Sequence, residues 1–315
     1  MKAPNKLLEE DIDTDSLFNQ DTQWYASIKY DGLRTIIMDG KVLSSSGKET
    51  YNNPALRLAL QPLCDYSQRH NLVFDGELCD PTIPCSQHLT WKSAKRNSVP
   101  EQMKFRCIEI LPKAEWDYFA SPFATFLQIR HKYIHLEELV PIFTMIQQRP
   151  LTNYAQFTEL IKTYNDGKHE GFILRNANSQ YKHGRATVKE RTFFKFKYLD
   201  TLDAKIIGYF PRRELKTGVP RERNVFGELA PVYTIDAYKE TQMLGGFDIL
   251  LEDGTITKCR PPIGLTLYDY TKMWKERETY LNRWVTFKKM SLGEKDKPRL
   301  IKNVQFRDDK ANTGE

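Results

Sequence analysis

The sequence predicts an α+β protein of two domains, the second of them an all-β barrel of the OB type. At 315 residues the chain is long enough for two domains, and its 40% hydrophobic content is enough for each to have a core. Strand-like and helical runs are mixed up to about Asp200, whereas short strands dominate after it. We therefore expect the first domain over residues 1–200 and the barrel over residues 201–315.

The first domain is expected to begin with strands joined by tight turns. Strand-like runs cover residues 25–29, 35–38 and 42–43. Asp31-Gly32 and Asp39-Gly40 separate these runs, and Asp-Gly at such a place is typical of a β-hairpin. The pattern predicts a meander with Lys29 at the end of its first strand.

Helices and further strands follow. Leu56, Leu60 and Leu63 lie near helical spacing and predict a helix over residues 55–70. Further helices are expected over residues 123–139 and 153–165, and further strands over residues 72–78, 105–111, 169–175 and 192–197. In the last of these strands the side-chain period of two puts Lys195 and Lys197 on one face. Residues 81–102, rich in Pro, Ser and Lys, are expected to form an exposed loop with some helix.

The second domain reads as a small barrel. Short strands are expected over residues 202–210, 231–237, 246–251, 256–259 and 284–290, with a helical segment near residues 267–280. Five short strands, turn-rich connections and one helix suit a closed or partly closed barrel.

Positive charge is concentrated in one part of the chain. The net charge is +6, and residues 182–223 hold twelve Lys and Arg against five Asp and Glu, so the rest of the chain is close to neutral. A basic stretch of this kind indicates a polyanionic partner, and the alternative is an ordinary solvated face.

The cysteines indicate a reducing compartment. The five are scattered and none forms a Cys-x-x-Cys pair, which argues against a structural zinc site. We expect an intracellular, cytoplasmic protein. The N-terminus has no apolar signal core and no run approaches membrane-spanning length, so no membrane partner is expected.

Lys29 is a candidate nucleophile. A lysine attacks only as the neutral amine, so its pKa must be lowered by burial or by nearby cations. A bend at Gly32 would bring Arg34, whose planar fork matches phosphate oxygens, beside a phosphate that Lys29 attacks. The alternative is a surface hairpin without chemistry.

Acids and cations elsewhere fit phosphate chemistry. Asp75, Glu77 and Glu170 stand at strand starts or ends and suit a hard cation such as Mg²⁺ or a ribose hydroxyl. Lys195 and Lys197 suit phosphates, since phosphoryl transfer needs mainly positioning and charge neutralisation. The alternatives are that Asp75 ends a turn, that Glu170 is a surface acid and that the two lysines form a solvated face.

The order of these motifs resembles a known superfamily. The motifs are KYDGLR (29–34), DGEL (75–78), EGFILR (170–175), KFK (195–197) and FRDDK (306–310). Together they resemble the covalent nucleotidyltransferases, the superfamily of polynucleotide ligases and mRNA capping enzymes, and most closely the minimal ATP-dependent DNA ligases of viruses and phages. The resemblance covers nearly the whole chain, and if the source is a virus it implies that the protein acts in the host cytoplasm. It implies an adenylation domain of two antiparallel sheets flanked by helices, followed by an OB-fold domain.

The resemblance also implies a reaction and its partners. Lys29 would attack the α-phosphate of ATP, form lysyl-AMP and release pyrophosphate. AMP would then pass to the 5′-phosphate at a nick in duplex DNA, and the 3′-hydroxyl would displace it. Mg²⁺ or Mn²⁺ would neutralise charge at each step. The protein is expected to act as a monomer that clamps the nick with its two domains.

The resemblance assigns roles residue by residue. Ser27 and Ile28 would lie beside the nucleotide, Glu77 would bind the ribose or a metal ion, and Glu170 a metal ion. Lys195 and Lys197 would hold the α-phosphate, and Lys195 would help to lower the Lys29 pKa. Arg34 would hold the nick phosphate or ribose, and Asp31 would act near the attacking hydroxyl or its metal. Arg307 and Lys310 would orient the pyrophosphate.

Three positions depart from the family pattern. The family often has a glutamate that reads the adenine amino group where this sequence has Ser27. It has an arginine where this sequence has Ser45, and an aromatic residue that stacks on adenine where this sequence has Ile108. The residues that read adenine are therefore left open, and main-chain groups are one possibility.

A basic stretch over residues 211–224 is a candidate DNA-binding loop. Its cations are Arg212, Arg213, Lys216, Arg221 and Arg223. A mobile loop of this kind would contact duplex phosphates without sequence preference, and the alternative is an ordinary exposed barrel loop. Residues 85–104, with Trp91, Lys92, Lys95, Arg96 and Lys104, form a second and weaker candidate surface.

Other functions remain open or are disfavoured. An RNA ligase and a GTP-dependent capping guanylyltransferase share the lysine motif. An NAD⁺-dependent ligase is disfavoured because only 28 residues precede Lys29 and zinc cysteines are missing. A non-catalytic nucleic-acid-binding module would need no nucleophile.

Overall fold

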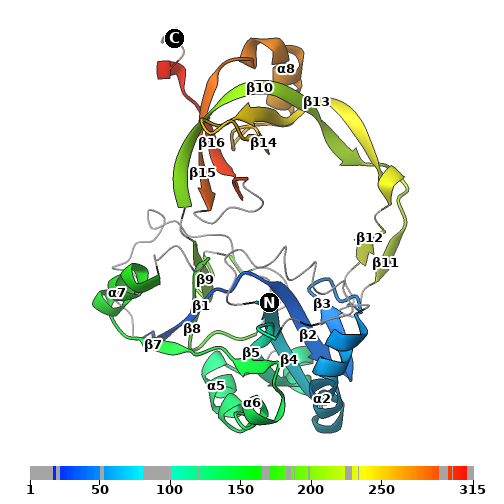
Figure 1. Ribbon diagram of the computed structural model, residues 1–315, viewed down its shortest axis with the longest axis vertical. Helices are drawn as coiled ribbons and strands as arrows, with labels where there is room; N and C mark the ends of the chain where they lie inside the picture. Colours follow the sequence, from blue (N-terminus) through cyan, green and yellow to red (C-terminus); the bar gives the residue numbers. More distant parts are fainter. Residues whose placement is uncertain are drawn as a thin grey trace. The chain divides into compact units, whose positions relative to one another are not determined.

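The computed structural model divides the chain into two compact units, Met1–Tyr198 and Leu199–Glu315. It describes residues 17–18, 22–49, 53–80, 99, 101–118, 121–164, 170–181, 186–187, 189–197, 199–223, 229–232, 234–290, 297–299 and 301–310. Figure 1 labels the elements of both units, which combine sheets and helices as the predicted α+β class requires. None of the helices in these ranges is both long and apolar enough to cross a membrane.

The first unit contains a four-stranded antiparallel sheet with the strand order β7-β1-β8-β9. Its strands are β1 (Trp24–Ile28), β7 (Arg149–Leu151), β8 (Gly171–Asn176) and β9 (Phe193–Lys197). Helix α7 (Tyr154–Tyr164) contributes its buried Phe157 and Leu160 to the hydrophobic core that this sheet forms. On β9 the burial alternates, with Phe194 and Phe196 buried, as the period of two predicted.

The second sheet of this unit has the order β3-β2-β4-β5-β6. Its strands are β2 (Leu33–Met38), β3 (Lys41–Ser44), β4 (Leu72–Cys79), β5 (Lys104–Pro112) and β6 (Phe143–Met145). All pairs are antiparallel except β5 with β6. Helix α2 (Pro54–His70) packs Leu56, Leu60 and Leu63 into its core. The Asn53 side chain caps this helix by accepting from Leu56 N at 3.1 Å.

The first Asp-Gly pair does not form the predicted hairpin. Strand β1 pairs with β7 and β8, and β2 pairs with β3 and β4, so the segment between β1 and β2 crosses from one sheet to the other. Gly32 is needed there for a close approach, because a Cβ on it would lie 2.4 Å from the carbonyl oxygen of Leu78. Only Asp39-Gly40, with φ of 52° and 73°, makes the hairpin turn.

Some first-unit predictions need correction. The single helix expected over residues 123–139 is two, α5 (Phe123–His131) and α6 (Leu136–Leu139). Helix α4 (Lys113–Tyr118) and the three-residue strands β6 and β7 were not predicted, because so few residues show no period. Most of the loop expected over residues 81–102 lies outside the described residues.

The second unit is built on a five-stranded antiparallel sheet with the order β14-β13-β10-β15-β16. Its strands are β10 (Leu199–Leu215), β13 (Tyr238–Leu250), β14 (Ile256–Cys259), β15 (Trp284–Met290) and β16 (Lys302–Phe306). The sheet curves around a core that includes Ile206, Phe247 and Phe287 (Figure 1). Helix α8 (Leu267–Lys275), which begins at a capping box of Thr266 and Asp269, adds Met273 to this core.

The two longest strands extend beyond the barrel as an arm. Figure 1 shows β10 and β13 running on together towards β11 (Arg221–Arg223) and β12 (Leu229–Pro231). The register shifts on both sides of Pro211, a residue that has no N–H to donate, and the strand bends there. The segment expected to be a loop over residues 211–224 therefore holds the end of β10 and all of β11. The strand expected over residues 231–237 is wrong as well, since Ile235–Ala237 is a 3₁₀ turn.

Candidate active site

Lys29 follows β1 directly and lies against the start of β8. Its backbone N–H donates to the carbonyl of Gly171 at 2.9 Å. Gly171 has a φ of 137°, and a Cβ there would lie 2.0 Å from the carbonyl oxygen of Phe196, so only glycine fits. The Lys29 ammonium forms an ion pair with Glu170, whose other carboxylate oxygen pairs with Lys197. Three motifs that are far apart in the sequence thus meet in one cluster.

The electrostatics of Lys29 differ from the expected ones. Burial lowers the pKa of Lys29, but the negative charges of Glu170 and Glu77 outweigh it, and the pKa is raised above its usual value. The expectation of a depressed pKa is therefore wrong for this structure. The reason is that Glu170 contacts the ammonium directly. The same contacts explain the pKa of Glu170. Burial raises this pKa, but Lys29 and Lys197 outweigh burial and bring it below its usual value.

Glu170 and Lys197 are not ordinary surface charges. Glu170 is 5% exposed, and the Lys197 side chain is 10% exposed. Both alternatives, a surface acid and a solvated lysine face, are wrong for these two residues. Lys195 lies on the same half-buried face of β9 as Lys197 and pairs in register with Ile173 of β8.

Arg34 is held by a buried carboxylate. Its Nε and Nη2 atoms donate to the two oxygens of Asp75 at 2.9 and 2.6 Å, a bidentate pairing. The Tyr181 hydroxyl donates to Asp75 at 2.6 Å and accepts from Arg34 at 2.9 Å. Asp75 lies inside β4 and is 3% exposed, so it does not simply end a turn. Burial raises its pKa, but Arg34 outweighs this and holds it below the usual range.

Glu77 lies opposite Arg34 in the register of β4 with β2. It accepts from the backbone N–H of Gly32 at 3.2 Å. Burial raises the pKa of Glu77 to about 7, with Lys29 opposing this shift and Glu170 adding to it. A hydroxyl donor or a further cation beside Glu77 would therefore stabilise its ionised form.

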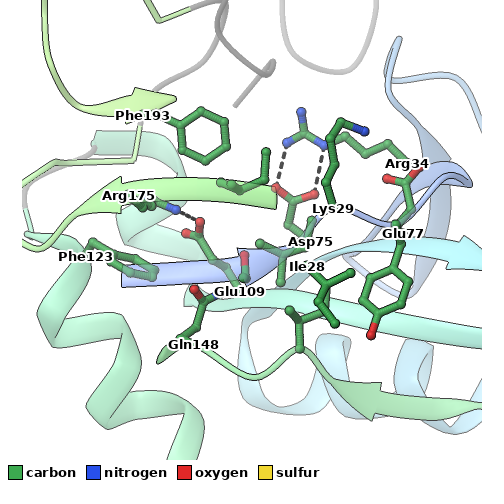
Figure 2. A pocket seen from close by; sticks show the side chains of 15 residues that line it. Ile28, Lys29, Arg34, Asp75, Glu77, Glu109, Phe123, Gln148, Arg175 and Phe193 are labelled. Atoms are coloured by element: carbon green, nitrogen blue, oxygen red, sulfur yellow. Dashed lines mark hydrogen bonds and ion pairs between the residues drawn. The ribbon is translucent and has the colours of Figure 1, made fainter. Parts of the chain in front are cut away.

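A pocket opens beside these groups. Its walls include six apolar side chains, Ile28, Ile108, Phe123, Ile146, Ile173 and Phe193. Lys29, Arg34, Asp75 and Glu77 line one part of it, and Glu109, Gln148 and Arg175 provide further polar groups, as Figure 2 shows. Ser27 lines the pocket as well. Apolar walls with a few polar groups and a charged end suit a flat ring system joined to phosphates.

An ion pair between Arg175 and Glu109 was missed by the sequence reasoning. Their side chains are 3% and 2% exposed. The Arg175 guanidinium also lies 4.2 Å from the ring centre of Phe123. Arg175 ends the motif EGFILR and Glu109 directly follows Ile108, so both lay in stretches that the sequence had already singled out. Tyr181 and Gln148 had no comparable signal in the sequence.

Comparison with known proteins identifies the family. The family model described as the ATP dependent DNA ligase domain matches residues 8–197. The chain belongs to the ATP-dependent DNA ligase family. The resemblance read from the motifs is thereby confirmed. Sequence comparison with curated proteins gives no match.

Solved structures agree on the fold of this family member. A structure named Pmar-Lig_Pre is 18% identical with a TM-score of 0.66, and the match covers 91% of this chain. The chain spans only 64% of the length of that structure. A structure from a study of DNA binding by Lig E DNA ligases, proteins with a minimal scaffold, is 17% identical with a TM-score of 0.63, and 98% of each chain is covered. The α+β fold class with a nucleotidyltransferase domain and an OB-fold domain is confirmed.

Other residues predicted for this ligase-family chain lie elsewhere. Asp31 is half-buried near Lys29, and Ser45 is exposed; neither lines the pocket. Arg307 belongs to the second unit, where it donates to Asp203 and Asp309. The Lys310 side chain and most of residues 85–104 lie outside the described part of the chain.

The carboxylates around Lys29 do not form a complete metal site in the described part of the chain. Within the described ranges, no group of three or more His, Cys, Asp or Glu side chains is arranged to hold a metal ion. Both oxygens of Glu170 are engaged by lysines, so a metal ion there would have to displace one of them. The residues thus do not form a ready metal site in this arrangement.

Proposed function

We propose that this protein is an ATP-dependent DNA ligase that seals nicks with a 5′-phosphate and a 3′-hydroxyl through lysyl-AMP at Lys29. The observation that supports it most is the position of Lys29. The nucleophile lies at the charged part of an apolar-walled pocket, in contact with Glu170 and within the same cluster as Lys197. The family model supports ATP as the substrate.

In the first step the Lys29 amine would attack the α-phosphorus of ATP. An N–P bond forms, the P–O bond to the β-phosphate breaks, and pyrophosphate leaves. Because Glu170 holds Lys29 as the ammonium, that group must lose a proton first. Lys197 and Lys195 are the cations that we expect to neutralise the α-phosphate. The carboxylate of Glu77 is suited to the ribose hydroxyls.

The later steps would use the part of the site around Arg34. We propose that Arg34 binds the 5′-phosphate of the nick, since Asp75 and Tyr181 fix its guanidinium in one orientation. AMP passes from Lys29 to this phosphate, and the 3′-hydroxyl then displaces AMP. Asp31, close to Lys29, is suited to a position near that hydroxyl.

The two units would divide the work. We propose that residues 1–200 form the adenylation domain and residues 201–315 the OB-fold domain. Arg307 and Lys310 of the second would orient the pyrophosphate. The five cations of the arm, Arg212, Arg213, Lys216, Arg221 and Arg223, would contact duplex phosphates.

A divalent cation is expected to arrive with the nucleotide. Mg²⁺ commonly binds through substrate phosphates and only one or two carboxylates, so it does not require a complete protein site. Once bound to the triphosphate it would neutralise negative charge. Glu77 is the pocket carboxylate best suited to contact it, because its described hydrogen bond comes from the Gly32 backbone, whereas Asp75 and Glu109 are each paired with an arginine.

Covalent labelling tests the proposal. The protein is treated with pyrophosphate, then incubated with α-labelled ATP and Mg²⁺, and resolved on a denaturing gel. We expect a labelled band for the wild type and for the control Lys113→Met, whose half-buried lysine pairs with Asp39 and Asp117. Lys29→Met should give no band. Labelling with GTP alone would transfer the proposal to capping chemistry, and no labelling with either nucleotide would overturn it.

The acceptor and the oligomeric state need separate measurements. Sealing of nicked DNA, compared with nicked RNA, distinguishes a DNA ligase from an RNA ligase. Sedimentation with and without nicked DNA tests whether one monomer binds one nick.

A further inference from the structure

The pocket lacks the two side chains that the family pattern leads one to expect around adenine. Ser27 stands where a glutamate would read the amino group, and Ile108 stands where an aromatic ring would stack. Both residues line the pocket, and the remaining walls are largely apolar. Apolar walls hold any purine, so the choice of base must come from polar groups.

The pair of Glu109 and Arg175 supplies such groups. Glu109 is on β5 directly after Ile108, and Arg175 is on β8 two residues after Ile173, another wall residue. Figure 2 shows the two side chains meeting beside Gln148 and Phe123. Both belong to the lining of the pocket, although their side chains are only 2% and 3% exposed.

Each member of the pair keeps one polar atom without a partner. Glu109 uses Oε1 for Arg175, and its Oε2 makes no hydrogen bond with any described residue. Arg175 uses Nη1 for Glu109, and its Nη2 is likewise unpartnered within the described ranges. A bidentate pairing, such as that of Arg34 with Asp75, would leave no such atoms. Buried polar atoms are normally satisfied, so these two point to a missing ligand.

The free atoms match one edge of adenine. Glu109 Oε2 is an acceptor and Arg175 Nη2 is a donor. Adenine presents a donor at its 6-amino group beside an acceptor at N1. Guanine presents these in the opposite order, an acceptor at O6 beside a donor at N1. A base held by the same sugar would therefore place guanine O6 against the Glu109 carboxylate, which is unfavourable.

We propose that Glu109 accepts a hydrogen bond from the adenine 6-amino group and that Arg175 both orients Glu109 and donates to N1. The pair thus selects ATP in place of the glutamate that Ser27 replaces. This inference rests on the proposed function, because it assigns the base specificity of the same pocket. The competing explanation is a structural ion pair that only joins β5 to β8.

Analogue kinetics separate these two explanations. The rate of lysyl-nucleotide formation is measured with ATP, with purine riboside triphosphate, which lacks the 6-amino group, and with GTP. The wild type should prefer ATP to the analogue by at least about tenfold in kcat/KM. In Glu109→Ala this ratio should fall to near one, chiefly through a higher KM for ATP, and GTP should become a better substrate relative to ATP. A purely structural pair would instead lower the rates with ATP and the analogue equally.

Control variants guard against a folding defect. Glu115→Ala removes a half-buried glutamate that bonds Ser121 and does not line the pocket, and it should keep the wild-type ratio. If Glu109→Ala unfolds, Glu109→Leu/Arg175→Met removes both charges together, which leaves no buried charge without its partner. This double variant should label with ATP and the analogue at similar rates.

The outcomes also separate this inference from the proposed function. A wild type that labels but does not distinguish ATP from the analogue overturns the inference alone. A wild type that labels with no nucleotide overturns the proposed function.

Discussion

The ammonium group of Lys29 and the carboxylate of Glu170 form an ion pair although 141 residues separate them. The backbone bond from Lys29 to Gly171 holds the two segments together at this point. Because Lys197 binds the other oxygen, the two lysines share one carboxylate, and the three groups together keep one net positive charge. The Glu170 carboxylate therefore affects both the stability of this cluster and the positive charge that the two lysines can offer to a phosphate.

Removal of the Glu170 charge should destabilise the first unit. In Glu170→Gln two poorly hydrated ammonium groups would face each other, and we expect a loss of about 3 kcal/mol in the free energy of unfolding, measured in urea. Glu170→Gln/Lys197→Met, which removes one of the cations, should lose less than the sum of the two single variants. The exposed Glu159→Gln is the control and should change stability little. Strict additivity in the cycle would contradict the shared-carboxylate arrangement.

Asp75 should make stability depend on acid. Burial raises its pKa, but Arg34 and Tyr181 outweigh this and hold it below the usual range. Such a group contributes stability that is present above its unfolded pKa of about 3.9 and is lost as the pH falls through the folded pKa. Asp75→Asn should therefore be less stable than the wild type by about 3 kcal/mol near neutral pH, and the difference should shrink below about pH 4.

Urea unfolding at a series of pH values measures this. The exposed Asp65→Asn is the control and should change stability little. Tyr181→Phe removes a hydrogen bond that lowers the Asp75 pKa and should cost about 1–2 kcal/mol. A constant gap between Asp75→Asn and the wild type down to low pH would argue against a lowered pKa.

Gly171 offers a test of close packing beside Lys29. Gly171 and Gly254 both have positive φ, 137° and 81°, but only at Gly171 would a Cβ meet another atom, the Phe196 carbonyl oxygen at 2.0 Å. Gly254→Ala should therefore cost about 1 kcal/mol from backbone strain alone. Gly171→Ala should cost several times more and should also abolish covalent labelling. Thermal unfolding and the labelling gel report the two effects, and equal melting temperatures for the two variants would rule the explanation out.

The arm cations should set the salt dependence of DNA binding. The changed positions are Arg212, Arg213, Lys216, Arg221 and Arg223, each replaced by Gln. We expect weaker binding to nicked duplex and a slope of log K against log salt that is shallower by up to about 4.5, since each of the five phosphate contacts would contribute about 0.9. Fluorescence anisotropy over a range of salt concentrations measures the slope.

A matched variant controls for total charge. It removes five exposed cations of the first unit, Lys41, Lys48, Arg57, Arg69 and Lys132. Its slope should change much less. Identical slopes for the two variants would show that the arm acts only through net charge.

The sequence predicted the site residues that lie at strand ends or alternate along a strand. Lys29, Glu77, Glu170 and Lys197 could be proposed as site residues because their motifs are local, and their roles remain predictions. In the structure these four residues lie close together, and each lies on or directly beside a strand, as the sequence predicted. The alternation of β9 was also predictable, since one face of a half-buried strand must be apolar.

The pairing of distant segments could not be predicted. Asp31-Gly32 looked like a hairpin because Asp-Gly signals a turn locally, whereas the partners of β1 are more than 100 residues away. Nor could the sequence show that Glu109 meets Arg175. The direction of the Lys29 pKa shift depends on which charged groups lie nearest to the ammonium, and only the packing of the chain determines that.

The crossing between β1 and β2 has a consequence for heat stability. The segment from Lys29 to Gly32 joins two sheets whose cores are separate. A nucleotide attached to Lys29 would contact side chains of both sheets and would hold them together. Anything that binds only the folded state shifts the melting temperature upward. The nucleotide-loaded protein should therefore survive heating that inactivates the bare chain, so heat treatment would enrich a preparation in protein that has already completed its first chemical step.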